Sequence, residues 1–218
     1  MRAVIFDMDG ILIDTERWLN KYWCQAALEA GFAMKPEHAL SIRSLDAKLA
    51  EPYLKSIFGE TFDYEKIRNR RRELVNAHIE KYGVDKKSGV DELLDYLKEK
   101  GIKAAVATAT ELVRAKEYLT AIGVCEKFDQ VISAKTVKNG KPAPDVYLYA
   151  CEQLGENPKD CIAVEDSPNG VLSAHRAGLR VVMVPDLSEP DEETAKLLTK
   201  KVKSLDEMIP FLEEELNS

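Results

Sequence analysis

The chain has 218 residues, of which 45% are hydrophobic and 32% charged. That balance is typical of a globular protein with enough apolar material for a buried core. A formal net charge of -7 argues against a general polyanion binder, so we expect no nucleic acid partner. A local basic patch on an acidic protein can still bind a small phosphorylated metabolite.

Cysteine spacing and hydropathy predict the cellular compartment of the protein and whether it associates with a membrane. No C-x-x-C pair is present, which favours reduced thiols over a zinc site or a disulfide framework. There is neither a secretory signal pattern nor an apolar stretch of about eighteen residues. We therefore expect a cytoplasmic protein with no membrane partner.

Five short apolar runs, each stopped by polar or turn residues, predict buried strands. Helical patterns separate them: 91–100, 111–121, one that follows Pro144 and stops before Gly155, and one from Pro168 to Gly178. Alternating strands and helices predict an α/β fold, a Rossmann-like doubly wound parallel sheet with helices on both faces. The predicted strands are 3–6, 104–107, 130–132, 161–164 and 181–184.

A helical block interrupts this alternation after the first strand. Its patterns cover residues 18–30, 45–58 and 64–82, with no convincing strand among them. We expect an all-helical cap domain at 15–83, inserted into a core domain made of residues 1–14 and 84–218. The hinges should lie near 13–16 and 83–89.

Polar side chains follow three of the predicted strands. Asp7 and Asp9 follow the first, Thr108 ends the second, and Glu165 and Asp166 end the fourth. Ligands bind beyond the carboxyl ends of strands in open parallel sheets. Acids gathered there repel one another, and a cation such as Mg²⁺, which prefers oxygen ligands, relieves the repulsion. Taken singly, each could instead cap the following helix.

Four segments in order resemble the signatures of haloacid dehalogenase-like phosphatases. The run 4–15, VIFDMDGILIDT, resembles the first signature, and Thr108 resembles the second. Lys141, in the run GKPAPD, resembles the third, and 164–170, VEDSPNG, resembles the fourth. The resemblance covers the whole chain, and the four signatures together are far more specific than any one of them.

The resemblance implies Mg²⁺-dependent hydrolysis of a small phosphate monoester. Asp7 takes the nucleophile's position and would form an aspartyl-phosphate, which water then hydrolyses. Asp9 takes the position of the general acid and base. Both are also implied as Mg²⁺ ligands, Asp9 through its backbone carbonyl.

The other signatures imply the binding residues. The Thr108 hydroxyl and the Ala109 backbone would hold phosphate oxygens, and Lys141 would balance the charge on Asp7 and on the transferring group. Asp166 would complete the metal site, with Glu165 as a further ligand or a partner of the ligands. Thr108 could also cap the following helix, and Lys141 taken alone could be a surface lysine.

The helical insert after the first strand resembles the branch that contains β-phosphoglucomutase and sugar phosphatases. The mutase carries a cap histidine and a cap arginine, whose positions fall on Leu19 and Asp46, with Arg43 nearby. Both departures favour hydrolysis, and phosphoglucomutase-type transfer remains the alternative. The branch suggests a sugar phosphate as substrate. Because many of its members are monomers, the resemblance also implies a monomer. Asp9 and Asp166 argue against a true dehalogenase, which needs neither.

Two further features of the insert have ordinary structural interpretations. The basic run at Arg68, Arg70, Arg71 and Arg72 predicts a solvated helix face, because acidic residues flank it and no aromatic residues alternate with it. The tryptophans of the first insert helix predict core or edge packing, and Trp18 lies close enough to the hinge to face substrate.

Overall fold

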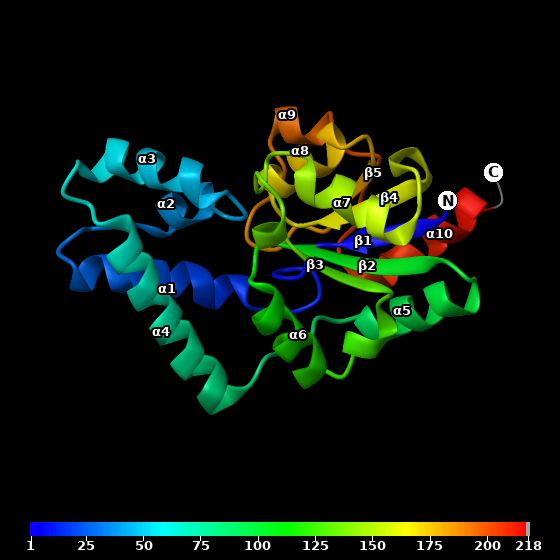
Figure 1. The fold of residues 1–218 in the computed structure, drawn as a ribbon, viewed down its shortest axis with the longest axis horizontal. Helices are drawn as coiled ribbons and strands as arrows, with labels where there is room; N and C mark the ends of the chain where they lie inside the picture. The colour runs from blue at the N-terminus through cyan, green and yellow to red at the C-terminus, as the bar shows by residue number, and fades with distance from the viewer. Residues whose placement is uncertain (217–218) are drawn as a thin grey trace.

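Six parallel strands form one sheet in the computed structural model, which describes residues 1–216 (Figure 1). Their order is β3-β2-β1-β4-β5-β6, so β1 lies inside the sheet, between β2 and β4. The chain reverses direction across the sheet on either side of β1, as in doubly wound folds. The strands are β1 (Ala3–Phe6), β2 (Lys103–Thr108), β3 (Gln130–Ser133), β4 (Cys161–Glu165), β5 (Arg180–Met183) and β6 (Lys200–Lys201).

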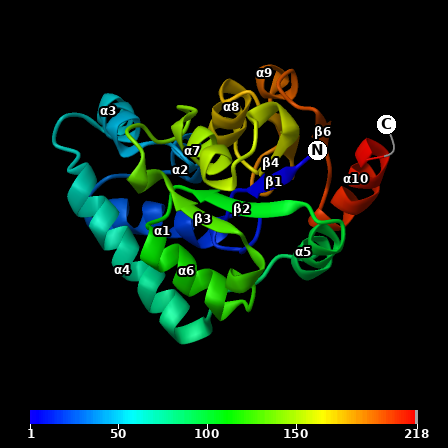
Figure 2. The same cartoon turned by 45° about the vertical axis from the view of Figure 1, so that its right-hand side comes forward.

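Helices cover both faces of the sheet (Figures 1 and 2). α5, α6 and α10 pack on one face, and α7 and α8 on the other. The α-helices are α1 (Glu16–Glu29), α2 (Pro36–Ser41), α3 (Ala47–Phe58), α4 (Tyr64–Tyr82), α5 (Val90–Glu99), α6 (Leu112–Ala121), α7 (Asp145–Leu154), α8 (Pro168–Arg176), α9 (Glu192–Ala195) and α10 (Met208–Leu216). Short 3₁₀ helices cover Cys125–Lys127, Ala134–Thr136, Pro158–Asp160 and Leu205–Glu207.

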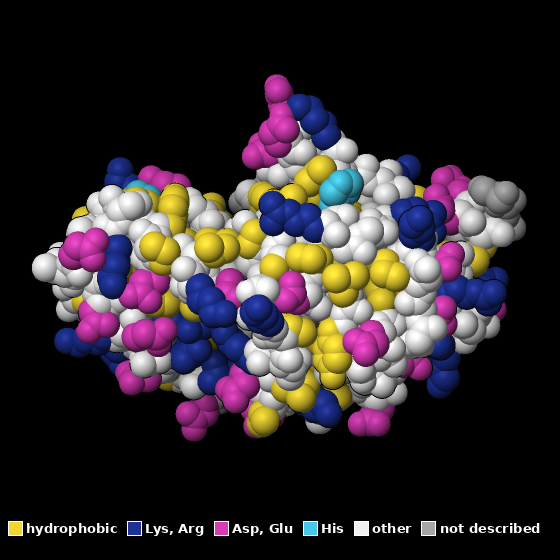
Figure 3. All heavy atoms as spheres, turned by 45° about the horizontal axis from the view of Figure 1, so that its top comes forward, with side chains coloured by type: hydrophobic (Ala, Val, Ile, Leu, Met, Phe, Trp, Pro, Cys, Tyr) yellow, Lys and Arg dark blue, Asp and Glu magenta, His cyan; other side chains and the backbone are white. Residues whose placement is uncertain are grey.

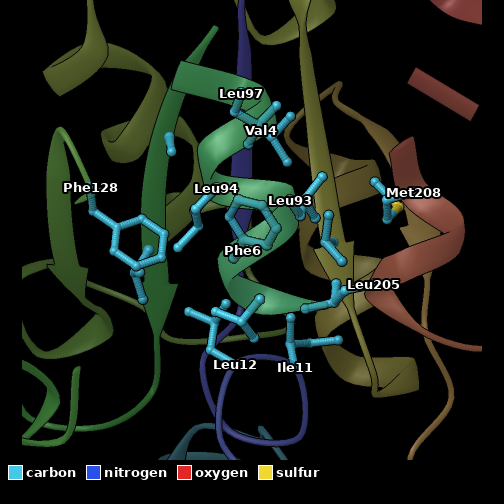
Figure 4. Packing of buried hydrophobic residues seen from close by; sticks show 14 of the residues in the cluster. Val4, Phe6, Ile11, Leu12, Leu93, Leu94, Leu97, Phe128, Leu205 and Met208 are labelled. Carbon is cyan, nitrogen blue, oxygen red and sulfur yellow. The ribbon is translucent and has the colours of Figure 1, made fainter. Parts of the chain in front are cut away.

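Strand residues alternate between the two cores. Val4 and Phe6 of β1 pack with α5 on one face, whereas Ala3 and Ile5 face α7 and α8. Figure 4 shows the first of these cores, with Leu93 of α5 beside β1. Side chains of a strand point to opposite faces in turn, so a strand buried on both faces needs an uninterrupted apolar run. The predicted fold class, a doubly wound α/β sheet, is confirmed.

Helices α1 to α4 pack around an apolar cluster of their own. Trp23 of α1, Leu54 of α3 and Ile67 of α4 belong to it, together with Phe62 between α3 and α4. Figure 1 shows this helical block beyond the carboxyl ends of the strands, where β1 leads into α1. The block therefore faces the edge of the sheet at which ligands bind in folds of this kind.

The predicted strands match the observed ones within one residue at each end, but several elements were not predicted. β6 has only two residues, and both are exposed lysines. α10 was not predicted either: its Phe211 and Leu212 are buried, whereas Glu213 and Glu214 of its acidic run are exposed. Within residues 1–216, no helix is long and apolar enough to span a membrane.

We predict that Leu93→Ala lowers the free energy of unfolding by about 2–5 kcal/mol, because it leaves a cavity in a closely packed core. Leu93 is 0% exposed. Leu28→Ala is the matched control, since Leu28 is 69% exposed and should lose less than about 0.5 kcal/mol. Urea denaturation measures both variants, and equal losses would contradict the assignment of the core.

Candidate active site

Two acids and one lysine form the centre of the site. Asp7 follows β1 and Glu165 ends the neighbouring β4, so parallel pairing places them side by side. Lys141 Nζ donates to Asp7 Oδ1 at 2.5 Å and to Glu165 Oε1 at 2.6 Å. The lysine is only 1% exposed. Burial lowers the pKa of Lys141, but the two carboxylates outweigh burial and raise it above its usual value, so the lysine stays charged.

Two glycines leave room for the acids. A Cβ on Gly170 would lie 2.0 Å from the Glu165 carboxyl group. A Cβ on Gly10 would lie 2.3 Å from Asp166 Oδ2, and the Gly10 φ of +82° is one that residues with side chains rarely adopt. Tyr147 donates its hydroxyl to Glu165 Oε1 at 2.7 Å and helps to fix that carboxylate.

The acids form a group that suits a divalent cation. Carboxylate oxygens of Asp7, Glu165 and Asp166 lie within 4.8 Å of one another, and all three residues are buried. Burial raises the pKa of Asp7 against the opposing effect of Lys141, and burial likewise raises that of Asp166 against Arg43. Both Asp166 side-chain oxygens are buried without a hydrogen bond. Such oxygens need a positive partner, and hard cations bind to carboxylate oxygens.

Asp9 lies apart from this acidic group, on a network of threonines. Thr15 Oγ1 donates to Asp9 Oδ1 at 2.5 Å, and Thr110 Oγ1 donates to Asp9 Oδ2 at 2.9 Å. Ser133 in turn donates to the Thr110 carbonyl at 2.6 Å. The Asp9 carboxyl group is thereby held in one orientation. The neighbouring Glu16 is also buried, and burial raises its pKa to about 8.

The segment after β2 contains the residues expected to bind phosphate. Thr108 is fully buried, and its hydroxyl accepts the backbone N–H of Thr110 at 3.0 Å. Helix α6 begins at Leu112 with Glu111 at the N-cap, so Thr108 does not cap it. Ala109 is exposed and lines the same cavity as Asp7 and Asp9.

A loop of the helical block reaches into the acidic group. Arg43 donates to the Asp166 carbonyl at 2.8 Å and lies 3.4 Å from Asp166 Oδ2. Its own carbonyl accepts a hydrogen bond from the Asn169 side chain at 2.9 Å. Next to it, Ser44 has a left-handed φ of 57°, which turns the loop sharply. Arg43 is therefore a buried partner of the acids.

Asp46 joins the same loop to the segment that carries Lys141. Its carboxylate caps α3 by accepting Lys48 N–H at 2.9 Å, and it also accepts Gly140 N–H at 2.6 Å. Its backbone N–H donates to the Lys141 carbonyl at 2.8 Å. One residue thus connects the helical block to the loop that positions the lysine.

A cavity of about 470 Å³ lies between the helical block and the sheet edge. Asp7, Asp9 and Glu16 line one part, and basic residues of α4 and α6 line another. Figure 3 shows Lys and Arg side chains gathered where the block meets the core. The interpretation of the basic run as a solvated face was wrong for three of its residues, since Arg68, Arg71 and Arg72 line the cavity. Arg70 is exposed and pairs with Glu29 and Glu73.

Trp18, which the sequence places close enough to the hinge to face substrate, is not among the residues that line the cavity. Its ring lies 4.0 Å from that of His78, and Arg17 lies over it at 4.9 Å. Trp23, five residues further along α1, is 7% exposed and lines the cavity. Because α1 turns by about 100° per residue, these two residues lie on different faces.

The structure thus gathers Asp7, Lys141, Glu165 and Asp166, with Asp9 and Ala109 on the adjoining wall of the cavity. Sequence reasoning missed three participants. Two of them had a signal in the sequence: Thr15 is the last residue of the run that resembles the first signature, and Thr110 follows Thr108 at the end of the second predicted strand. Tyr147 lies within a helix, and nothing in its sequence pattern indicates a role in the site.

The chain is similar in sequence and in fold to known proteins. The model of a family described as haloacid dehalogenase-like hydrolase matches residues 4–184. A "phosphorylated carbohydrates phosphatase" of Thermotoga maritima is 33% identical over 82% of each chain. "Hexitol phosphatase A" of Escherichia coli is 32% identical over 87% of this chain and 88% of its own. The fold resembles that of a β-phosphoglucomutase from Clostridium difficile, with a TM-score of 0.84 at 24% identity, over 100% of this chain and 97% of that one.

We predict that Asp46→Ala lowers the free energy of unfolding by about 2–3 kcal/mol, because it removes a helix cap and a charged acceptor for Gly140 N–H. Asp63→Ala is the matched control. Asp63 caps α4 through Lys66 N–H at 3.1 Å but has no bond to the core, so it should lose about 1 kcal/mol. Urea denaturation gives both values. Equal losses would mean that the bond to Gly140 adds nothing.

Proposed function

The chain belongs to the haloacid dehalogenase-like hydrolase family, and on that premise we propose that it hydrolyses a small phosphate monoester through an aspartyl-phosphate on Asp7. The observation that supports this most is Lys141, buried between Asp7 and Glu165 at 2.5 and 2.6 Å. A lysine in this place keeps Asp7 oriented and balances the charge that gathers during phosphoryl transfer.

In the proposed reaction, a carboxylate oxygen of Asp7 attacks phosphorus, and the bond from phosphorus to the ester oxygen breaks. The leaving oxygen takes a proton from Asp9, which thereby becomes a carboxylate. Water then attacks the phosphorus of the aspartyl-phosphate and gives a proton to Asp9. The bond between phosphorus and the Asp7 oxygen breaks, so inorganic phosphate is released and Asp7 is restored. The bonds to Asp9 from Thr15 and Thr110 support this role, because they aim its carboxyl group.

The buried acids would hold Mg²⁺, with Asp7 and Asp166 as ligands, Glu165 as ligand or support, and the Asp9 backbone carbonyl as a further oxygen. The Asp166 oxygens, which accept no hydrogen bond, and the space left by Gly10 fit this assignment. When bound, Mg²⁺ supplies positive charge beside the phosphate oxygens. Thr108 and the Ala109 backbone would bind the same oxygens from the β2 side.

We further propose that residues 15–83 act as a cap and that 1–14 with 84–218 form the catalytic core. Contacts of Arg43 and Asp46 with the core support a cap that covers the site and excludes water. Relatives named as phosphatases of phosphorylated carbohydrates and hexitols support a sugar phosphate as the substrate.

Hydrolysis is favoured over phosphoglucomutase-type transfer by two cap positions. Leu19 lines the cavity where the mutase carries a histidine. Asp46, at the expected arginine position, is engaged with Gly140. Neither side chain can contribute to handling a second phosphate as the basic residues of the mutase would.

We predict that Asp7→Asn lowers kcat for phosphate release by about 1000-fold or more, because the amide cannot act as the nucleophile. The assay uses sugar phosphates and nucleotides with Mg²⁺. Asp14→Asn is the control, since Asp14 forms an ion pair with Arg17 at 3.1 Å outside the acidic group and should retain kcat within about tenfold. Activity retained in Asp7→Asn would exclude this mechanism.

The same assay distinguishes hydrolysis from phosphoglucomutase-type transfer. β-Glucose 1-phosphate with a trace of β-glucose 1,6-bisphosphate should give phosphate, or no reaction. Conversion to glucose 6-phosphate without net phosphate release would instead establish a mutase.

We predict that Mg²⁺ at about a hundred times its Kd adds about 2.7 kcal/mol to the unfolding free energy, a rise in Tm of about 5–10 °C. Gly10→Ala should lose most of this rise, because its Cβ displaces Asp166. Gly31→Ala is the matched control, with a φ of +88° and no atom within 4 Å, so it shares the backbone strain but keeps the rise. Thermal unfolding with and without Mg²⁺ measures the rise in Tm for each variant. An equal rise in Tm for Gly10→Ala and Gly31→Ala would contradict the metal site.

A further inference from the structure

The wall of the cavity formed by α4 and α6 is strongly basic. Arg68, Arg71 and Arg72 of α4 lie at spacings of three and four residues, so they share one face of the helix. Arg114 of α6 lines the same cavity. Four arginines of α4 and α6 therefore line a cavity that Asp7 and Asp9 also line.

These arginines have almost no acidic partners. Arg68 lies 3.5 Å from Glu65, whose side chain is 59% exposed. Arg72 donates to the neutral Asn69 side chain, at 3.1 Å. In the described part of the chain, no carboxylate lies within 4 Å of a charged nitrogen of Arg71, Arg72 or Arg114. Buried or half-buried cations without an anion destabilise a fold, so this arrangement calls for a partner from outside the chain.

Arg71 is the most confined member of the group. Its guanidinium lies over the Trp23 ring at 5.1 Å, and its Nε is buried without a hydrogen bond. Burial and the charges of Arg68 and Arg72 lower the pKa of Arg71 to about 10. Burial and the charges of Arg68 and Arg114 lower that of Arg72 as well. An anion among these groups would supply the missing hydrogen bond and relieve the repulsion.

We propose that Arg68, Arg71, Arg72 and Arg114 bind a second anionic group of the substrate, a carboxylate or a second phosphate, while the phosphate that is removed lies at Asp7. This inference rests on the proposed function and narrows its substrate to doubly anionic phosphate esters. Guanidinium groups suit both anions because their paired N–H donors match two oxygens. The arginines line a cavity of about 470 Å³, a volume typical of small-molecule pockets.

Binding measurements test the proposal without turnover. Asp7→Asn with Mg²⁺ is titrated by calorimetry with two matched pairs of probes. 3-Phosphoglycerate against glycerol 3-phosphate tests a carboxylate, and fructose 1,6-bisphosphate against fructose 6-phosphate tests a second phosphate. We expect the doubly anionic member to bind about 100-fold more tightly in at least one pair, as two charge-assisted hydrogen bonds allow.

Variants then assign the difference to the arginines. With Arg71→Gln or Arg72→Gln added, the ratio of Kd values within the pair should fall to less than about tenfold. Either variant suffices if the other does not fold. Arg70→Gln, added in the same way, is the matched control: it removes a charge from the same helix, but Arg70 is exposed and pairs with Glu29 and Glu73, so the ratio should persist.

Two outcomes would overturn the proposal: ratios near one in both pairs, or a ratio that survives in Arg71→Gln and Arg72→Gln. Neither outcome affects the proposed function, which is judged by phosphate release from the unsubstituted chain. Conversely, a ratio that depends on Arg71 in a chain that releases no phosphate would support the anion site and refute the hydrolase.

Discussion

The buried contact of Lys141 with Asp7 and Glu165 is the constraint around which the site is arranged. Two carboxylates at the ends of neighbouring parallel strands cannot be buried together at little cost unless a cation lies between them. Lys141 meets both at 2.5 and 2.6 Å from the loop before α7. The strand order, with β1 beside β4, brings the acids together, and the right-handed crossover through α7 brings the lysine.

The fold and the acids of the site could be predicted because they depend on local patterns. Strands buried on both faces need unbroken apolar runs, and β1, β2, β4 and β5 each contain one. Asp7 and Glu165 lie where two of those runs end, so a parallel sheet is enough to predict that the two residues lie close together. β6 has two exposed lysines and α10 ends in an acidic run, so neither gives such a pattern.

The basic wall of the cavity could not be predicted in this way, because the direction of a helix face depends on tertiary packing. Arg70 and Arg71 are neighbours in a run that is basic all round the helix, yet Arg70 faces solvent and Arg71 the cavity. Only the packing of α4 against α1, through Ile67 and Trp23, decides which arginines turn inward. Tyr147 is a similar case: its role comes from the position of α7 beneath the sheet edge.

The charges of the site also connect the two parts of the molecule. Arg43 faces Asp166 from the helical block, whereas Asp7 and Glu165 face it from the core. Asp46, three residues further along the same loop, bonds to Gly140 and to the carbonyl of Lys141. Separating the block from the core would therefore leave Asp166 without its protein cation and the lysine loop without its bonds to Asp46. Since these contacts reach both the buried Lys141 and the carboxylate of Asp166, the charge balance among the acids depends on how closely the helical block approaches them.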